Sequence, residues 1–284
     1  MSKRHQSDYD DVTTARCERA LVTLLGDIGP WSQRIYLVGG LAPRYIVGSL
    51  PEGARPHVGT TDVDLVIGLA LGDESPEAYR TLENNLKKGG FRAESSFRWI
   101  KNVEGVSVIV EFLCETDQVE PGRIYKPKEA MTGSGLGAFN VRGAQLVTRD
   151  YVVRAIEAPR LDDGGLSRVE VRVANILSYA VLKILAFQDR HENKDSYDLV
   201  YCLLNFGEGP HDAGRVAASS AILNDTQVRE SLQLLAERFE SVDHDGPRAY
   251  GTFLAEEGDT DEAARLQQEA VAAVRDFLQA LGTR

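Results

Sequence analysis

The sequence predicts an α+β protein in which a mixed β-sheet flanked by helices is followed by a helical C-terminal domain. Two observations support this fold class. In the first part of the chain, short apolar runs of strand length alternate with amphipathic helical patterns. From about residue 174 onward, apolar residues follow helical spacing to the end. We therefore expect two domains, residues 1–172 and residues 173–284.

The elements of the first domain follow from local patterns. An apolar stripe at helical spacing predicts the first helix, and Ser75 followed by Pro76 marks the start of another, because serine caps helices and proline fits their first turn. The glycine-rich stretch at residues 121–137 fits neither a helix nor a strand. In order, we expect a helix at residues 9–28, a strand at 34–39, a short helix at 41–48, a strand at 62–68, a helix at 76–88, strands near 97–101 and 106–113, and strands at 145–156 and 168–173.

A doubled glycine and two aspartates mark the ends of neighbouring predicted strands. Gly39 and Gly40 follow the first strand, and Asp62 and Asp64 begin the next. Successive side chains of a strand point to opposite faces, so these two carboxylates share a face. Mg²⁺ binds one or two carboxylates and completes its shell with water and substrate phosphates, so we expect a nucleoside triphosphate as substrate, with Mn²⁺ as an alternative ion. Glycine lets the backbone approach that triphosphate closely.

The predicted strand at residues 106–113 carries one acidic side chain, Glu111, among residues that suit a strand buried on both faces. An isolated buried charge is very costly, so this carboxylate must be paired or bound to a cation. Two alternatives stay open: an internal salt bridge, or a third carboxylate beside Asp62 and Asp64 in a two-metal site.

A second group of charged residues lies on the predicted helices that follow residue 173. Lys183 is carried on an apolar helix, where its ammonium could reach a phosphate or extend to solvent. Arg190, Lys194 and Asp195 follow at the turn into the next helix. Asp195 and Asp198 lie three apart on one helix face, so either could hold a cation in place or cap the helix.

Both blocks, in this order, resemble those of known enzymes. The glycine pair, the Asp-x-Asp pair and the separate strand acid look like the nucleotidyltransferase fold typified by DNA polymerase beta. The second block resembles the signature of the AbiEii/AbiGii toxin family, which includes the MenT-type tRNA nucleotidyltransferases: Lys183, Arg190 and then Lys194-Asp195-Ser196-Tyr197-Asp198-Leu199. One departure is the connection formed by residues 41–61, which is longer than in compact members of the superfamily.

The resemblance implies a reaction and roles for these residues. It implies transfer of a nucleoside monophosphate to the 3′ end of a tRNA acceptor stem, which is the action of a toxin in a toxin–antitoxin or phage-defence system and requires a cognate antitoxin protein. The helical domain would complete the active site. The implied catalytic residues are Asp62, Asp64, Lys183 and Asp198; the implied nucleotide-binding residues are Gly39, Gly40, Thr61, Lys183, Arg190, Lys194 and Asp195; and the implied metal ligands are Asp62, Asp64 and Glu111.

Charge argues against a nucleic-acid substrate. The formal net charge is −11 and the isoelectric point is about 5.0, whereas polyanion binding relies on clustered Lys and Arg. Basic residues near the site in sequence would offset this if the acidic ones gather in the last third of the chain. Two rival functions therefore remain: the same chemistry directed at a small molecule such as an aminoglycoside or at a protein hydroxyl, and a catalytically silent binding module.

Cysteine, histidine and hydropathy patterns complete the expectations. Three widely spaced cysteines indicate a reducing compartment, and no signal peptide or membrane-spanning run is visible, so we expect a cytoplasmic protein without a membrane partner. The five histidines are isolated in the sequence. Of these, we expect His57 and His191 to lie on the surface.

Overall fold

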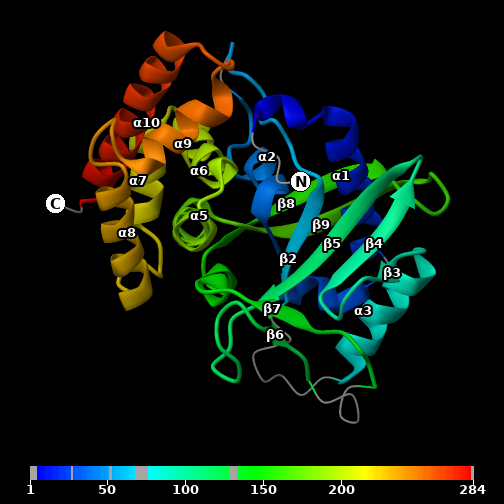
Figure 1. Cartoon of the computed structure of the whole chain (residues 1–284). Coiled ribbons are helices and arrows are strands. Elements are labelled where there is room, and N and C mark those ends of the chain that lie inside the picture. Colours follow the sequence, from blue (N-terminus) through cyan, green and yellow to red (C-terminus); the bar gives the residue numbers. More distant parts are fainter. Residues whose placement is uncertain (1–4, 27, 51–52, 68–75, 128–132, 283–284) are drawn as a thin grey trace. The chain divides into compact units, whose positions relative to one another are not determined.

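The computed structural model describes residues 5–26, 28–50, 53–67, 76–127 and 133–282 (Figure 1). The chain divides into two compact units. Asp10–Ala42 and Gly59–Ala174 form the first, which we call the sheet unit. Met1–Tyr9, Pro43–Val58 and Asn175–Arg284 form the second, the helical unit. The segment Pro43–Val58 therefore belongs with the helices although it lies between two strands of the sheet in sequence.

The sheet unit is built on one mixed sheet, in the order β3-β4-β5-β2-β1-β9-β8 among the described strands. The strands β1 and β9, and likewise β2 and β5, pair in parallel, while β1–β2, β3–β4, β4–β5 and β8–β9 pair antiparallel. A short strand, β7, adds to β5 in parallel and carries β6. The strand bounds are β1 Ile35–Val38, β2 Asp62–Ile67, β3 Arg92–Ala93, β4 Arg98–Val103, β5 Val106–Cys114, β6 Ile124–Tyr125, β7 Ala138–Asn140, β8 Tyr151–Pro159 and β9 Leu166–Ala174.

Two helices of the sheet unit, α1 (Asp11–Gly26) and α3 (Pro76–Lys88), contact each other, and α1 also packs on β2, β5, β8 and β9. The buried positions of β2 explain this packing. Val63 and Leu65 alternate with the two aspartates and are fully buried, so one face of the strand is apolar and the other acidic.

The helical unit packs six α-helices, one short α-helix and the 3-10 helix Gln6–Asp8 among the residues that the structure describes. The helix α6 contacts α5, α9 and α10, and α10 contacts α7 and α9. The short helix α2, which belongs to the segment between β1 and β2, packs on α6. The helix bounds are α2 Pro43–Ile46, α5 Ile176–Arg190, α6 Asn193–Asn205, α7 Pro210–Ala218, α8 Thr226–Arg238, α9 Asp245–Leu254 and α10 Thr260–Leu281.

The predicted fold class is confirmed: a mixed sheet flanked by helices is followed by a helical C-terminal region. Two local predictions were wrong. The expected strand at residues 145–156 begins at Tyr151, because Gly143 takes a left-handed conformation (φ 84°) and starts a 3-10 helix at Ala144–Thr148. The glycine-rich stretch contains a strand after all, β6, which pairs with β7. No described helix has the length and apolar character needed to cross a membrane.

Candidate active site

The predicted acidic residues lie on one face of the sheet, in two neighbouring strands. Asp64 on β2 is in register with Glu111 on β5, which in turn faces Arg98 on β4; on the other side Asp64 pairs with Val38 on β1. Residues in register point to the same face of a sheet, and Asp62, two positions earlier on β2, shares that face. Both aspartates are partly exposed. We call Asp62, Asp64 and Glu111 the acid row.

The glycine pair lies against the acid row. A Cβ at Gly39 would stand 1.8 Å from Oδ2 of Asp64, so the backbone at this position touches the carboxylate where any side chain would clash. Gly39 also has a φ of +66°, a conformation that favours glycine. The next residue, Gly40, is buried in the 3-10 turn that Gly39 starts. The sequence predicted that this backbone approaches a triphosphate, which stays a prediction; the structure shows the backbone of Gly39 against the carboxylate of Asp64.

Asp62 is held by a threonine that the sequence analysis did not single out. The hydroxyl of Thr60 donates to Oδ1 of Asp62 at 2.6 Å. Thr60 is itself fixed to α1, because its backbone N–H donates to Oγ1 of Thr14 at 3.0 Å. Thr61, the predicted neighbour, is partly exposed. The start of β2 is therefore anchored to α1 by a bond between the Thr60 backbone and the Thr14 side chain, two residues 46 positions apart, a separation that no local pattern reveals.

Glu111 is ion-paired. Its Oε1 accepts a hydrogen bond from Nε of Arg98. A second nitrogen of Arg98, Nη1, lies 3.5 Å from Oε2 of Glu94. The internal salt bridge, one of the two alternatives left by the sequence, is thus present. Within the described residues, no group of three or more His, Cys, Asp or Glu side chains is arranged to hold a metal ion. Asp62 and Asp64 are the two carboxylates that β2 places on one face.

In the helical unit, Lys183 lies between two buried aspartates. Its Nζ is 2.6 Å from Oδ2 of Asp198 and 3.1 Å from Oδ1 of Asp195. All three side chains are buried: Lys183 is 6% exposed, Asp195 1% and Asp198 0%. Lys183 therefore does not extend to solvent. An ion pair this deep is stable only when the remaining oxygen atoms are also bonded, and the neighbouring side chains meet that requirement.

Two further cations complete the shell of the aspartates. Arg190 binds Asp195 through both Nε and Nη2, at 2.6 and 2.7 Å, a bidentate arrangement that suits a carboxylate. Lys194 Nζ lies 2.8 and 3.0 Å from the two oxygens of Asp198. Both aspartates therefore hold cations. The Arg190 side chain is 59% exposed, so it is the member of this set that reaches the solvent.

His57 joins the same set, and the prediction that it lies on the surface was wrong. It is 2% exposed, and its Nε2 is 2.9 Å from Oδ1 of Asp198. Its ring stacks on Tyr197 and meets Tyr201 edge-on, with centroids 5.1 and 4.9 Å away. His191, by contrast, is exposed as expected. The sequence held no signal for His57 because its partner is 141 residues away.

We call His57, Lys183, Arg190, Lys194, Asp195 and Asp198 the Lys183 cluster. Burial alone would raise the pKa of Asp198, but the ammonium groups of Lys183 and Lys194 outweigh it and hold the pKa well below its usual range. Burial would lower the pKa of Lys183, and the two aspartates outweigh that effect and raise it. For His57, burial dominates and lowers the pKa to about 4. At neutral pH the cluster holds three cations, two carboxylates and a neutral imidazole, so it carries surplus positive charge.

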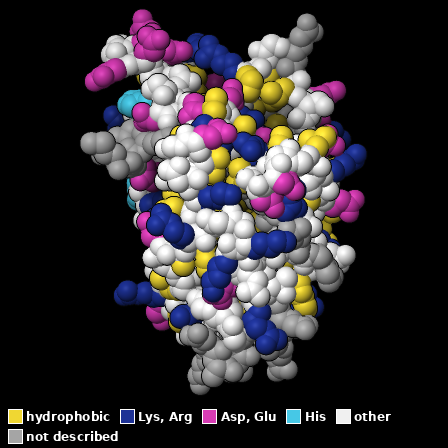
Figure 2. Space-filling view, turned by 90° about the vertical axis from the view of Figure 1, so that its right-hand side faces the viewer, with side chains coloured by type: hydrophobic (Ala, Val, Ile, Leu, Met, Phe, Trp, Pro, Cys, Tyr) yellow, Lys and Arg dark blue, Asp and Glu magenta, His cyan; other side chains and the backbone are white. Residues whose placement is uncertain are grey.

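The surface is not uniformly acidic despite the net charge of −11. Figure 2 shows Lys and Arg side chains spread across one face of the molecule with Asp and Glu side chains among them. This face therefore does not carry the uniform negative charge that would repel an anionic ligand.

Comparison with known proteins establishes no family. No protein-family model matches the sequence, and no curated protein matches it. Among solved structures, the crystal structure of ANT(2")-Ia in complex with adenylyl-2"-tobramycin matches with 14% sequence identity and a TM-score of 0.31, covering 66% of this chain and 90% of that chain. A likeness at this level does not show shared membership, so the AbiEii/AbiGii resemblance stays a prediction.

Proposed function

We propose that this protein is a metal-dependent nucleotidyltransferase, which transfers a nucleoside monophosphate from a nucleoside triphosphate to an acceptor hydroxyl and releases pyrophosphate. The observation that carries the proposal is the contact between the Gly39 backbone and the Asp64 carboxylate, in a row that also contains Asp62. Only a glycine lets the backbone come this close to the carboxylate, and glycine is typical of turns where the backbone approaches a ligand.

The donor set fits a magnesium ion that is shared with its substrate. Mg²⁺ keeps several waters and is usually bound through one or two carboxylates plus substrate phosphates, so Asp62 and Asp64 are sufficient without a preformed cage. Manganese also accepts carboxylate and water ligands. Such an ion would neutralise negative charge on the triphosphate and polarise its α-phosphate. Glu111 would join as a third ligand only if it leaves Arg98.

The residues of this chain then have separate tasks. Asp62, oriented by Thr60, and Asp64, fixed against Gly39, would hold the ion. The acceptor oxygen attacks the α-phosphorus, a new P–O bond forms, the bond to the β-phosphate breaks, and the hydroxyl proton passes to a carboxylate of the acid row or to water. Gly40 and Thr61 would contact the triphosphate beside this row.

The Lys183 cluster supplies positive charge in the proposed reaction. Its surplus charge suits the charge that develops on the leaving pyrophosphate. Arg190 is the exposed cation, so we assign it the phosphate contact. Lys183 and Lys194 keep Asp195 and Asp198 ionised, and these aspartates in turn orient the cations.

For the acceptor, we propose the 3′ end of tRNA, with the protein acting as a toxin that a cognate antitoxin neutralises. This part of the proposal rests on the family resemblance of the two sequence blocks. The net charge of −11 favours a second candidate, a cationic small molecule such as an aminoglycoside. A protein hydroxyl is a third acceptor class.

A labelling experiment tests the proposal. The purified protein is incubated with Mg²⁺, each nucleoside triphosphate radiolabelled at the α-phosphate, and total tRNA, an aminoglycoside mixture or total protein as acceptor. We expect Asp64→Asn to label tRNA at least about a hundredfold more slowly than the wild type. Asp243→Asn is the matched control, because it removes an exposed carboxylate from another Asp-x-Asp pair.

The acceptor that takes the label decides between the candidates. Label on tRNA from the wild type and from Asp243→Asn supports the whole proposal. Label on aminoglycosides or protein alone keeps nucleotidyl transfer and removes the tRNA acceptor. If folded wild-type protein labels none of the three, the proposal fails and a silent binding module takes its place.

A further inference from the structure

Arg172 of β9 lies on the same face of the sheet as the acid row. It is in register with Tyr36 of β1, and Tyr36 lies two positions before Val38, which pairs with Asp64. Residues in register share a face of a sheet, and so do residues two apart on one strand. Two strands and two residues therefore separate Arg172 from Asp64, which is about 12 Å between their Cα atoms.

Two tyrosines hold the guanidinium group of Arg172. Its Nη1 donates to the hydroxyl of Tyr36 at 3.3 Å. Its Cζ lies 4.8 Å from the ring centroid of Tyr151 and 5.8 Å from that of Tyr36, and the two rings meet edge-on at 5.3 Å. Aromatic rings attract a guanidinium and orient it. Arg172 is therefore fixed without a carboxylate, and it forms no ion pair within the described part of the chain.

The remaining edge of this guanidinium can still bind an anion. The side chain is partly exposed; its Nε and Nη2 form no hydrogen bond within the described residues, and neither nitrogen is fully buried. Arg190 uses the same two nitrogens to bind Asp195. This edge matches the oxygens of a carboxylate or a phosphate through two parallel hydrogen bonds. Arg172 thus presents an oriented pair of donors on the acid-row face.

Arg172 lies on the side of the acid row away from the glycine turn. Along β1, the turn at Gly39 follows the residue that pairs with Asp64, whereas Tyr36 precedes it. On β2, which runs antiparallel to β1, Asp62 lies on the glycine side of Asp64. A triphosphate bound at the glycine turn would therefore leave the Arg172 side to the other substrate, the acceptor.

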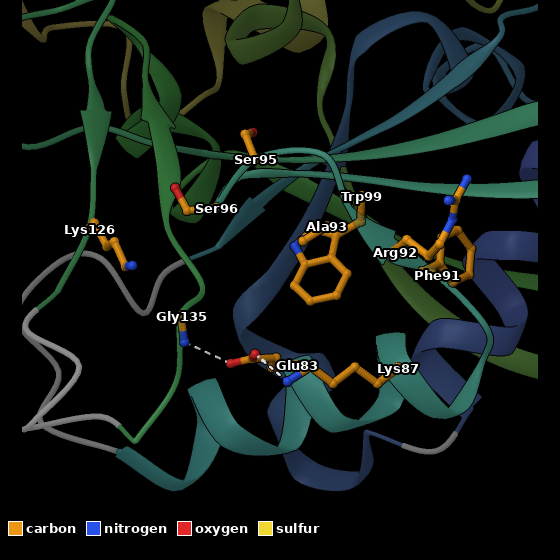
Figure 3. A pocket seen from close by; sticks show the side chains of 10 residues that line it. All are labelled: Glu83, Lys87, Phe91, Arg92, Ala93, Ser95, Ser96, Trp99, Lys126 and Gly135. Carbon is orange, nitrogen blue, oxygen red and sulfur yellow. Dashed lines mark hydrogen bonds and ion pairs between the residues drawn. The ribbon is translucent and has the colours of Figure 1, made fainter.

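The opposite face of the sheet, to which Trp99 points, carries a cavity of about 460 Å³ (Figure 3). Its cations do not converge on one anion: Lys87 already pairs with Glu83 at 2.7 Å, and Lys126 and Arg92 stand at opposite sides. Arg172, by contrast, presents both of its donors from one fixed group.

We propose that Arg172 is a specificity-determining residue that binds a phosphate group of the acceptor. The assignment rests on the proposed nucleotidyl transfer at the acid row. A nucleic-acid strand carries one negative charge for about every 3.4 Å of helix rise, so a strand whose 3′ hydroxyl lies beside Asp64 also brings phosphates to the Arg172 side. A cationic aminoglycoside would be repelled there. Arg172 therefore favours a nucleic-acid acceptor, although the net charge of the protein is −11.

Binding of RNA by the full chain tests this contact without requiring transfer. A short single-stranded RNA with a fluorophore at its 5′ end is titrated with protein and Mg²⁺, without a nucleoside triphosphate, and fluorescence anisotropy gives the dissociation constant. We expect Arg172→Gln to bind at least about tenfold more weakly than the wild type. The slope of log K against log salt concentration should fall by about 0.7, the value for one phosphate contact to a single strand.

Two variants serve as matched controls. Arg154→Gln removes the same charge from the same hairpin, but Arg154 pairs with Val171, next to Arg172, and so points to the opposite face; it should bind RNA as the wild type does. Arg172→Lys keeps the charge and loses the two-point geometry, so it should keep the salt slope and bind about threefold more weakly.

Neutral linkages in the RNA identify the phosphate. A methylphosphonate replaces each of the last linkages before the 3′ end in turn. We expect one replacement to weaken binding by the wild type at least about fivefold and to weaken binding by Arg172→Gln no further, because both changes remove the same contact. The loss of one charge elsewhere on the protein does not produce this coupling.

Calorimetric titration of the four nucleoside triphosphates with Mg²⁺ separates the two sources of phosphate. Arg172→Gln should bind them as tightly as the wild type, and weaker binding would assign the phosphate to the triphosphate and overturn the acceptor contact. Absence of saturable RNA binding by the wild type, equal weakening by Arg154→Gln, or no coupling to any methylphosphonate would overturn it too. Coupling to RNA in a protein that transfers no label would instead overturn the proposed function and leave Arg172 as a nucleic-acid contact.

Discussion

The buried imidazole of His57 makes the stability of the protein depend on pH, and the direction of the effect follows from its surroundings. Burial lowers its pKa from 6.5 to about 4; hydrogen bonding to Asp198 opposes the shift, and Lys194 and Lys183 add to it. The folded protein therefore holds His57 neutral, while the unfolded chain takes up a proton below pH 6.5. This contribution to stability is complete above the unfolded pKa and is lost as the pH falls from 6.5 towards about 4.

His57→Gln isolates this contribution, because glutamine does not titrate and its amide can still donate to Asp198. Each pKa unit is worth about 1.4 kcal/mol, so lowering the pH from about 7.5 to about 5 should cost the wild type about 2 kcal/mol more than the variant. Urea unfolding followed by circular dichroism at the two pH values measures both losses. His211→Gln, at an exposed histidine of α7, should lose as much as the wild type.

Two results would refute this reasoning. Equal losses in the wild type and in His57→Gln would mean that burial does not lower the pKa of His57. A larger loss in the variant would mean that folded His57 is protonated and forms an ion pair with Asp198, so that the carboxylate outweighs burial.

Three further predictions concern the acid row, the Lys183 cluster and the buried thiol of Cys114. Gly39→Ala places a methyl group against the Asp64 carboxylate and should lower the free energy of unfolding by about 1–3 kcal/mol more than Gly48→Ala does. Gly48 is the matched control, because its φ is similar (+70°) but a Cβ there meets nothing within 4 Å. Equal losses in urea unfolding would contradict the contact. Lys183→Met leaves two buried carboxylates with one cation fewer and should cost about 3–5 kcal/mol in the same assay, and a loss below about 1 kcal/mol would show that the ion pairs are not buried as described. Burial, aided by Glu115, raises the pKa of Cys114 to about 12, so mass spectrometry should find alkylation at about pH 8 at least about a hundredfold slower in native than in unfolded protein; equal rates would contradict its burial.

Much of the fold could be predicted from the sequence because its signals are local. The alternation of aspartates with Val63 and Leu65 identifies β2 within six residues, and the helical spacing around Lys183 identifies α5 in the same way. The grouping of Lys183 with Asp195 and Asp198 was also accessible, since all three lie on two consecutive helices. A turn such as Gly143 changes the element type through a single backbone angle, and the strand prediction failed there.

The partners that fix these residues could not be predicted, because they come from distant parts of the chain. Thr60 orients Asp62 but is itself held by Thr14, and His57 reaches Asp198 across 141 residues. Which polar side chains make these contacts depends on which of them are buried. A single sequence indicates burial only where apolar residues recur at regular spacing. An isolated histidine beside a polar loop has no such period, so His57 resembled a surface residue.

The length of the connection between Gly40 and Asp62 has a structural explanation in these contacts. Its central part, Pro43–Val58, folds with the helical unit: α2 packs on α6, His57 bonds to Asp198, and the backbone N–H of Val58 donates to the Tyr197 hydroxyl at 3.0 Å. The chain returns to the sheet unit at Gly59, and Thr60 is bonded to α1 one residue later. A short loop could join β1 to β2 but could not supply His57 to the Lys183 cluster. His57 in this connection completes the shell of Asp198. Three residues later, Thr60 fixes the start of the strand that carries Asp62 and Asp64. One segment of the chain therefore supplies contacts to the Lys183 cluster and to the acid row.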